Sequence, residues 1–168
     1  MRIITITGIS WSWKTTLQNE LQKRGWAKPL NFTTRSPRND SELDEYVFLT
    51  KEQFEEKNHL WHFLEHTEFR DNNYAISKFI DKDKDLAVVV EPNGREQIRE
   101  RALAHSLPFK AYFLELDRET QEQRLSRRGG NWRERLWDEE LISPKEGDTI
   151  LDWKASPEYL ANLIETDD

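Results

Sequence analysis

The sequence predicts an α/β fold, with a mainly parallel sheet flanked by helices. Three observations lead to this prediction. The chain opens with a strand, a short loop and a helix. Strand-like and helix-like segments then alternate, and the segment 85–91 contains a run of apolar residues, Leu86–Val90, without polar alternation. A strand of that last kind is typically buried on both faces, as in a parallel sheet. Strands that alternate with helices are the pattern of α/β layers.

Each element has its own local signal. The β-branched residues of 2–7 favour a strand that Gly8 ends. Strands are likewise expected at 85–91, 109–116 and 148–152. Capping residues and breakers predict helices over Lys14–Arg24 (stopped by Gly25), over 95–105 after a turn at Pro92–Gly94, from a cap at Asp117 to Arg128, and from Pro157 onward.

The stretch from Thr33 to Ser77 interrupts this alternation. It contains a polar turn, a short strand near Tyr46, a helix from Lys51 and further strand-like segments. We interpret it as an inserted subdomain within a single domain. The core would then comprise 1–32 and 78–168, and the insert 33–77.

Composition and charge exclude several classes of function. The 168 residues include 25 Lys and Arg against 32 Asp and Glu, a formal net charge of −7. This argues against broad binding to nucleic acid or to an anionic membrane, which needs clustered cations. The absence of cysteine excludes disulfides, thiolate metal sites and a cysteine nucleophile. No apolar run approaches a membrane span and the N-terminus lacks a signal-peptide core, so we expect a cytoplasmic protein.

A phosphate-binding loop is the first candidate site. In the pattern G-x-x-x-x-G-K-[ST], backbone N–H groups cradle phosphates, the lysine neutralises charge and the hydroxyl binds Mg²⁺. Trp13 occupies the second glycine position. If that position needs a positive φ, a bulky residue there costs roughly 1–2 kcal/mol, and an indole directed into the loop would block a phosphate. A strand–turn–helix with a chance glycine and lysine is the alternative. The candidate ATP and Mg²⁺ residues are Gly8, Ser12, Lys14, Thr15 and Thr16, with Thr15 as the metal ligand.

Two groups of arginine are further candidates. Arg35 and Arg38 lie in a proline-stiffened turn, and guanidinium groups match phosphate oxygens; the alternative is a solvated basic turn. The second group flanks Gly129–Gly130, which suits a flexible lid at about 128–138 over a transferring phosphoryl group. An ion-paired helix face or a small RNA-contacting patch is the alternative there. This group comprises Arg124, Arg127, Arg128, Arg133 and Arg135.

A pattern typical of zinc hydrolases, H-x-x-E-H, runs from His62 to His66. That chemistry needs both histidines on one helical face. The neighbouring residues predict a strand instead, so we expect no metal site here.

Taken together, these motifs form a specific combination. They are the Gly8–Thr15 loop, Thr33–Arg38, Tyr46–Phe48, Phe63–Glu65, Asn73–Tyr74, Glu91–Gly94 and Arg124–Gly129. The combination resembles the guanylate kinase family of P-loop nucleoside monophosphate kinases, from Met1 to about Leu136. The resemblance implies a P-loop kinase fold with an inserted NMP-binding subdomain and a short arginine-rich lid.

The same resemblance implies an activity and the residues that carry it. The γ-phosphate of ATP would pass to a nucleoside monophosphate, GMP or dGMP, with Mg²⁺ bound. Glu65 would face the guanine, whose adjacent N1–H and N2–H₂ donors suit an ionised carboxylate. The acceptor would be held by Asn31, Arg35, Arg38, Tyr46, Glu65, Tyr74 and Glu91. The transferring group would be stabilised by Lys14, Arg124, Arg128 and Arg135 (or Arg133).

Several positions depart from the family pattern. Trp13 replaces a glycine, Ala75 replaces another, and Asn31 and Ile76 stand where hydroxyl residues are usual. An impaired module that binds a nucleotide or phosphorylated partner without turnover is therefore the alternative function. A kinase of phosphorylated sugars is a third reading, which Glu65 disfavours. Nucleotides are the expected partners, and the sequence leaves the oligomeric state open.

Overall fold

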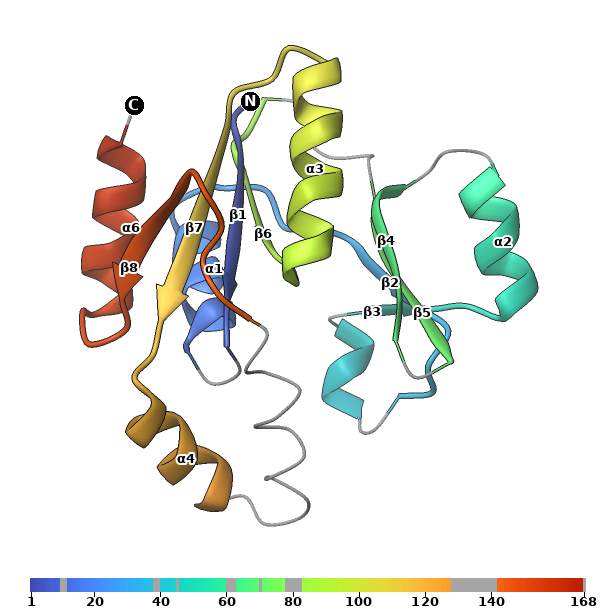
Figure 1. Cartoon of the computed structure of the whole chain (residues 1–168). Coiled ribbons are helices and arrows are strands. Elements are labelled where there is room, and N and C mark those ends of the chain that lie inside the picture. Colours follow the sequence, from blue (N-terminus) through green and yellow to red (C-terminus); the bar gives the residue numbers. More distant parts are fainter. Residues whose placement is uncertain are drawn as a thin grey trace.

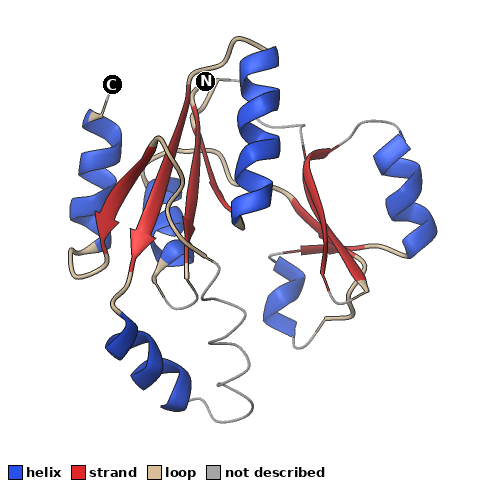
Figure 2. Ribbon diagram, in the orientation of Figure 1, coloured by secondary structure: helices blue, strands red, loops and turns tan. Residues whose placement is uncertain are grey.

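The computed structural model describes residues 1–9, 12–37, 40–44, 46–59, 63–69, 71–77, 83–127 and 142–167. In these ranges the strands form two four-stranded sheets that lie side by side (Figures 1 and 2). Helices pack against both, in the layered arrangement that the sequence predicts.

The first sheet is parallel throughout and has the order β6-β1-β7-β8. Its strands are β1 (Ile3–Gly8), β6 (Leu86–Val89), β7 (Phe109–Glu115) and β8 (Asp148–Asp152). All six residues of β1 are buried, as the β-branched run suggests. The predicted α/β fold with a mainly parallel sheet is confirmed.

Helices cover both faces of this sheet, and β1 shows how. Ile4 and Ile6 point to one face and pack in the same cluster as residues of α1 (Lys14–Lys23) and α6 (Pro157–Thr166). Ile3 points to the other face and shares a cluster with α3 (Pro92–Ala104). The alternation along a strand thus places α3 on one side and α1 and α6 on the other (Figure 1).

The helix ends follow the predicted caps with one correction. The Asp117 carboxylate accepts from the Thr120 N–H at 2.9 Å and caps α4 (Arg118–Arg127). At α6 the prediction named only Pro157 in the first turn, and the structure adds Ser156 as the N-cap, whose side chain accepts from the Tyr159 N–H. The expected turn at Pro92–Gly94 is wrong, because these residues form the first turn of α3. Proline suits that position, since the first N–H of a helix has no intrahelical acceptor.

The second sheet has the order β3-β2-β5-β4 and is mixed. Its strands are β2 (Asn31–Thr33), β3 (Tyr46–Phe48), β4 (Phe63–Phe69) and β5 (Asn72–Ser77). A 3₁₀ helix, η1 (Asp40–Asp44), precedes β3, and α2 (Lys51–His59) follows it. Phe54 of α2 is fully buried against Phe32 and Phe63, which gives this sheet a small core of its own.

Helix α3 joins the two sheets through the edge strand β4. The side-chain amide of Gln97 donates to the His66 carbonyl at 2.9 Å and accepts from the His66 N–H at 3.2 Å. The Arg101 guanidinium donates to the Phe63 carbonyl. Polar side chains of α3 thus take up backbone groups that an edge strand leaves unpaired.

Candidate functional site

The predicted phosphate-binding loop joins β1 to α1, and the structure describes its Gly8–Ile9 and Ser12–Lys14 portions. Gly8 has φ 141°, and a Cβ there would lie 2.5 Å from the Leu114 carbonyl oxygen, so only glycine fits. The Lys14 ammonium donates to the carbonyls of Gly8 and Ile9, each at 2.7 Å. Buried Ser12 donates its hydroxyl to the Ile9 carbonyl at 2.8 Å. The lysine therefore lies against the loop, where it can neutralise a bound phosphate.

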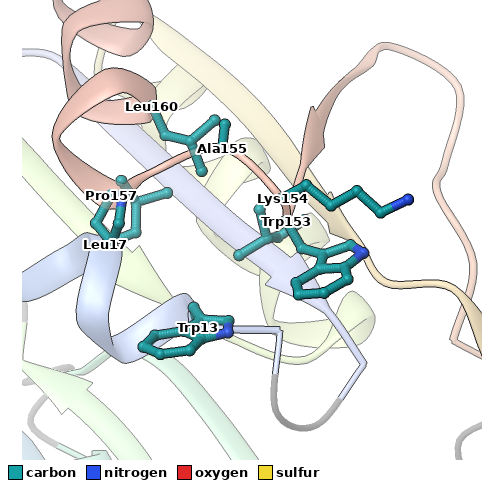
Figure 3. Close-up of a pocket in the computed structure, with 8 residues that line it drawn as sticks. Trp13, Leu17, Trp153, Lys154, Ala155, Pro157 and Leu160 are labelled. Carbon is teal, nitrogen blue, oxygen red and sulfur yellow. The ribbon is translucent and has the colours of Figure 1, made fainter. Parts of the chain in front are cut away.

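Trp13 adopts the left-handed backbone that the sequence analysis considered costly for a bulky residue at this position. Its φ is 66° and its ψ is 18°, and it offers no side-chain cap to α1. The indole is half exposed and points away from the loop, onto a neighbouring cavity of about 210 Å³ (Figure 3). Strain is thus present at Trp13, but obstruction of the loop by the indole is not.

That cavity lies beside the start of α1 and the connection from β8 to α6. Trp13 and Leu17 line it from α1, while Trp153 and Pro157 line it from the connection. The Trp153 indole N–H donates to the Asp117 carboxylate at 3.2 Å, which fixes its ring. The result is a largely apolar cavity with an indole on each side, next to the loop against which Lys14 lies (Figure 3).

Thr15 and Thr16 lie in the first turn of α1 and are exposed to solvent. The first amides of a helix favour anions, because the helix dipole is positive at this end. The two hydroxyls therefore lie at the helix end that favours an anion, next to Lys14.

Four predicted acceptor residues share one face of the second sheet. Asn31 lies opposite Tyr46 on one neighbouring strand and opposite Ile76 on the other. Glu65 also lies opposite Ile76, and Tyr74 is two residues before it on β5. Directly opposed residues, and residues two apart, point to the same face of a sheet. The register thus gathers these side chains on a single surface.

Arg35 joins this group from the turn that follows β2. Its guanidinium lies 5.9 Å from the Tyr46 ring centroid, and Tyr74 is near enough to contribute to the raised pKa of Arg35. The guanidinium also pairs with the Glu42 carboxylate at 3.0 Å, and this pairing is the main reason that the pKa of Arg35 is raised. The sequence analysis missed Glu42. Its only signal was an acidic residue in the same polar turn as the arginine.

Glu65 is the buried acid of the site. Its exposed fraction is 5%, and burial raises its pKa to about 7, with Arg101 opposing and Glu91 adding to the shift. Glu91 is the N-cap residue of α3, so both carboxylates lie near the start of that helix. Gly94, in the first turn of α3, lies directly against the Glu65 side chain.

The remaining predicted residues are described only in part or lie outside the described residues. Arg124 belongs to α4, and only its backbone is described. The predictions for Arg38, Arg128 and Arg135 lie outside the described residues, as does His62. Within the described ranges no group of three or more His, Asp or Glu is placed to bind a metal ion. In the same ranges no helix is long and apolar enough to cross a bilayer.

Comparisons with known proteins point to one family. The family model described as guanylate kinase matches residues 1–146. A guanylate kinase of Clostridioides difficile (strain 630) is 35% identical over 107 residues, 58% of this chain and 52% of the relative. A guanylate kinase of Alkalilimnicola ehrlichii is 26% identical over 175 residues, 98% of this chain and 81% of the relative.

A solved structure gives the same fold. The crystal structure of guanylate kinase from Anaplasma phagocytophilum matches with a TM-score of 0.69 at 19% identity, over 99% of this chain and 85% of that one. The alignment with the Clostridioides protein spans only about half of that relative's length. The family model nevertheless covers most of the chain, and the chain belongs to the guanylate kinase family.

Proposed function

We propose that this protein transfers the γ-phosphate of ATP to GMP or dGMP. The observation that carries the proposal is the position of Arg35, beside Tyr46 and Tyr74, at the end of β2 in the sheet that presents buried Glu65. A cationic fork with two phenols suits a phosphate, and a carboxylate beside it suits guanine. We assign the core to 1–32 and 78–168, the acceptor-binding insert to 33–77 and a lid to about 128–138.

The acceptor site offers one group for each end of GMP. Arg35 would exchange its present partner, Glu42, for the acceptor phosphate, while Tyr46 and Tyr74 add hydroxyl donors. Ionised Glu65 would accept from guanine N1–H and N2–H₂. Asn31 and Glu91 would complete the acceptor site, together with Arg38.

On the donor side, the loop from Gly8 to Thr15 would hold the phosphates of ATP. Lys14 already lies over the loop and would turn from the carbonyls of Gly8 and Ile9 to the phosphate oxygens. The cavity between Trp13 and Trp153 has room and apolar walls for the flat base of a nucleotide.

The residues present fit a magnesium ion shared with substrate. Mg²⁺ usually keeps several waters and takes its other ligands from phosphates, so a protein need supply only one or two oxygens. The Thr15 hydroxyl, exposed at the start of α1, would supply one such oxygen. When bound, the ion would neutralise charge on the transferring phosphoryl group.

Phosphoryl transfer asks this chain for positioning and charge rather than for a nucleophile of its own. An oxygen of the acceptor phosphate attacks the γ-phosphorus as the bond to the β-phosphate oxygen breaks, which yields ADP and a nucleoside diphosphate. Arg35 and Glu65 would orient the acceptor, and Lys14 would stabilise the charge that develops. We assign the same stabilising role to Arg124, Arg128 and Arg135.

A coupled assay of ADP formation with ATP and Mg²⁺ tests the proposal across GMP, dGMP, AMP, CMP and a hexose phosphate. We expect ADP with GMP and dGMP, and loss of activity in Arg35→Ala. Exposed Arg99 provides the matched control, since Arg99→Ala removes an arginine outside the site. Absence of turnover with every acceptor contradicts the proposal. Calorimetric binding of GMP without turnover would instead identify a binding module.

A further inference from the structure

We infer that Gly94 sets the base selectivity of the acceptor site by leaving room for the Glu65 side chain beside α3. The inference rests on the proposed function, because it concerns the same site. A Cβ on Gly94 would lie 2.9 Å from Glu65 Oε1, 3.0 Å from its Cγ and 3.1 Å from its Cδ. Real Cβ atoms hardly ever come so close to another group. A side chain at position 94 and Glu65 in its present place exclude each other.

The backbone of Gly94 does not require glycine. Gly94 is buried in the first turn of α3 and is not among the glycines with positive φ. Alanine adopts helical backbone more readily than glycine does. The atoms that an added methyl group would meet form the end of a flexible side chain, which can rotate without moving the main chain. Alanine at position 94 therefore preserves the helix and displaces the carboxylate.

The contacts of α3 with β4 keep the strand itself from adjusting. Gln97 holds both backbone groups of His66, and Arg101 holds the carbonyl of Phe63. These two strand residues flank the position of Glu65 on either side. Gly94, Gln97 and Arg101 follow the i, i+3, i+7 spacing of a single helix face, so one face of α3 fixes the strand and makes room for its acid.

The expected consequence is specific to the base. Two guanine donors, N1–H and N2–H₂, must meet the two oxygens of one carboxylate, so a rotated Glu65 loses at least one of these hydrogen bonds. Inosine monophosphate (IMP) lacks the 2-amino group and makes only one of these hydrogen bonds, so rotation of Glu65 lowers its affinity less. One hydrogen bond to a charged group corresponds to about ten- to a hundredfold in affinity.

The experiment compares GMP with IMP in the wild type, in Gly94→Ala and in Asn93→Ala. Asn93 is the exposed neighbour in the same turn and serves as the matched control. For each chain, kcat/KM is measured with ATP and Mg²⁺, and Kd by calorimetry without ATP. We expect Gly94→Ala to lower the preference for GMP over IMP by tenfold or more, with an unchanged or higher melting temperature. Asn93→Ala should retain the wild-type preference.

A double-mutant cycle separates positioning from a general effect on the fold. In a Glu65→Ala background, Gly94→Ala should leave the GMP to IMP ratio unchanged, because no carboxylate remains to displace. An unaltered preference in the single variant, an equal loss for both acceptors, or a lower melting temperature overturns the inference alone. A wild type that binds neither acceptor overturns the proposed function, and the inference with it.

Discussion

The backbone of Trp13 supports a prediction whose sign depends on a single dihedral angle. At φ 66° a residue other than glycine costs about 1–2 kcal/mol. Trp13→Gly removes this cost and Trp13→Ala retains it, while both variants lose the same indole. The extra freedom of glycine in the unfolded chain offsets part of the gain. We therefore expect the glycine variant to have the larger free energy of unfolding, by about 1 kcal/mol.

Loss of the indole makes both variants less stable than the wild type. Trp13 is 50% exposed, so its buried half amounts to roughly 100 Å² of apolar surface, worth about 2–3 kcal/mol. Trp13→Ala should then be less stable than the wild type by about 2 kcal/mol, and Trp13→Gly by about 1 kcal/mol. For a chain of this size, each kcal/mol shifts the melting temperature by about 2–4 °C.

Urea unfolding followed by circular dichroism measures these differences. Asn19 provides the matched control, because it is exposed in the interior of the same helix. At an ordinary helical position the order reverses, and Asn19→Ala should be more stable than Asn19→Gly by about 1 kcal/mol. If alanine at position 13 matches or exceeds glycine in stability, the left-handed backbone and the reasoning built on it are wrong.

Three further predictions concern charged groups. The pKa of Glu65 is raised from 4.5 to about 7, so the wild type loses stability as the pH rises through that window. In urea unfolding, the free energy of unfolding of Glu65→Gln relative to that of the wild type should therefore increase by about 3 kcal/mol between pH 4.5 and 8, and a difference that does not change with pH contradicts this. Glu42→Gln frees Arg35 from its ion pair and should tighten GMP binding about fivefold by calorimetry, whereas weaker binding would mean that Glu42 orients Arg35. Asp148→Ala removes the buried carboxylate that Arg95 contacts at 2.7 Å, and because Glu96 and the Glu146 carbonyl still accept from that guanidinium, it should cost about 1–3 kcal/mol in thermal unfolding; an unchanged stability disagrees.

Much of the fold could be predicted because the decisive signals are local. The β-branched run of β1, the apolar run of β6, the Asp117 cap and Pro157 at the start of α6 each act within a few residues. The start of α3 was missed for a local reason too, since Pro92 is favoured both in turns and in the first turn of a helix.

The site is harder to predict, because its contacts join residues that are far apart in the sequence. The resemblance to a family suggested Glu65 and Arg35, but no pattern in the chain predicts that Gly94 packs against Glu65. The ion pair between Arg95 and Asp148 likewise joins α3 to the start of β8. Such approaches depend on how helices and sheets pack, which periodicity does not specify.

The most direct test of the account follows the phosphorus atom itself. With ATP labelled at the γ-position, GMP and Mg²⁺, we predict that the label appears in GDP, and that Lys14→Ala abolishes the transfer while Lys23→Ala, in the exposed last turn of the same helix, does not. Label that remains in ATP or is released as inorganic phosphate would contradict the assignment of this chain as a phosphotransferase.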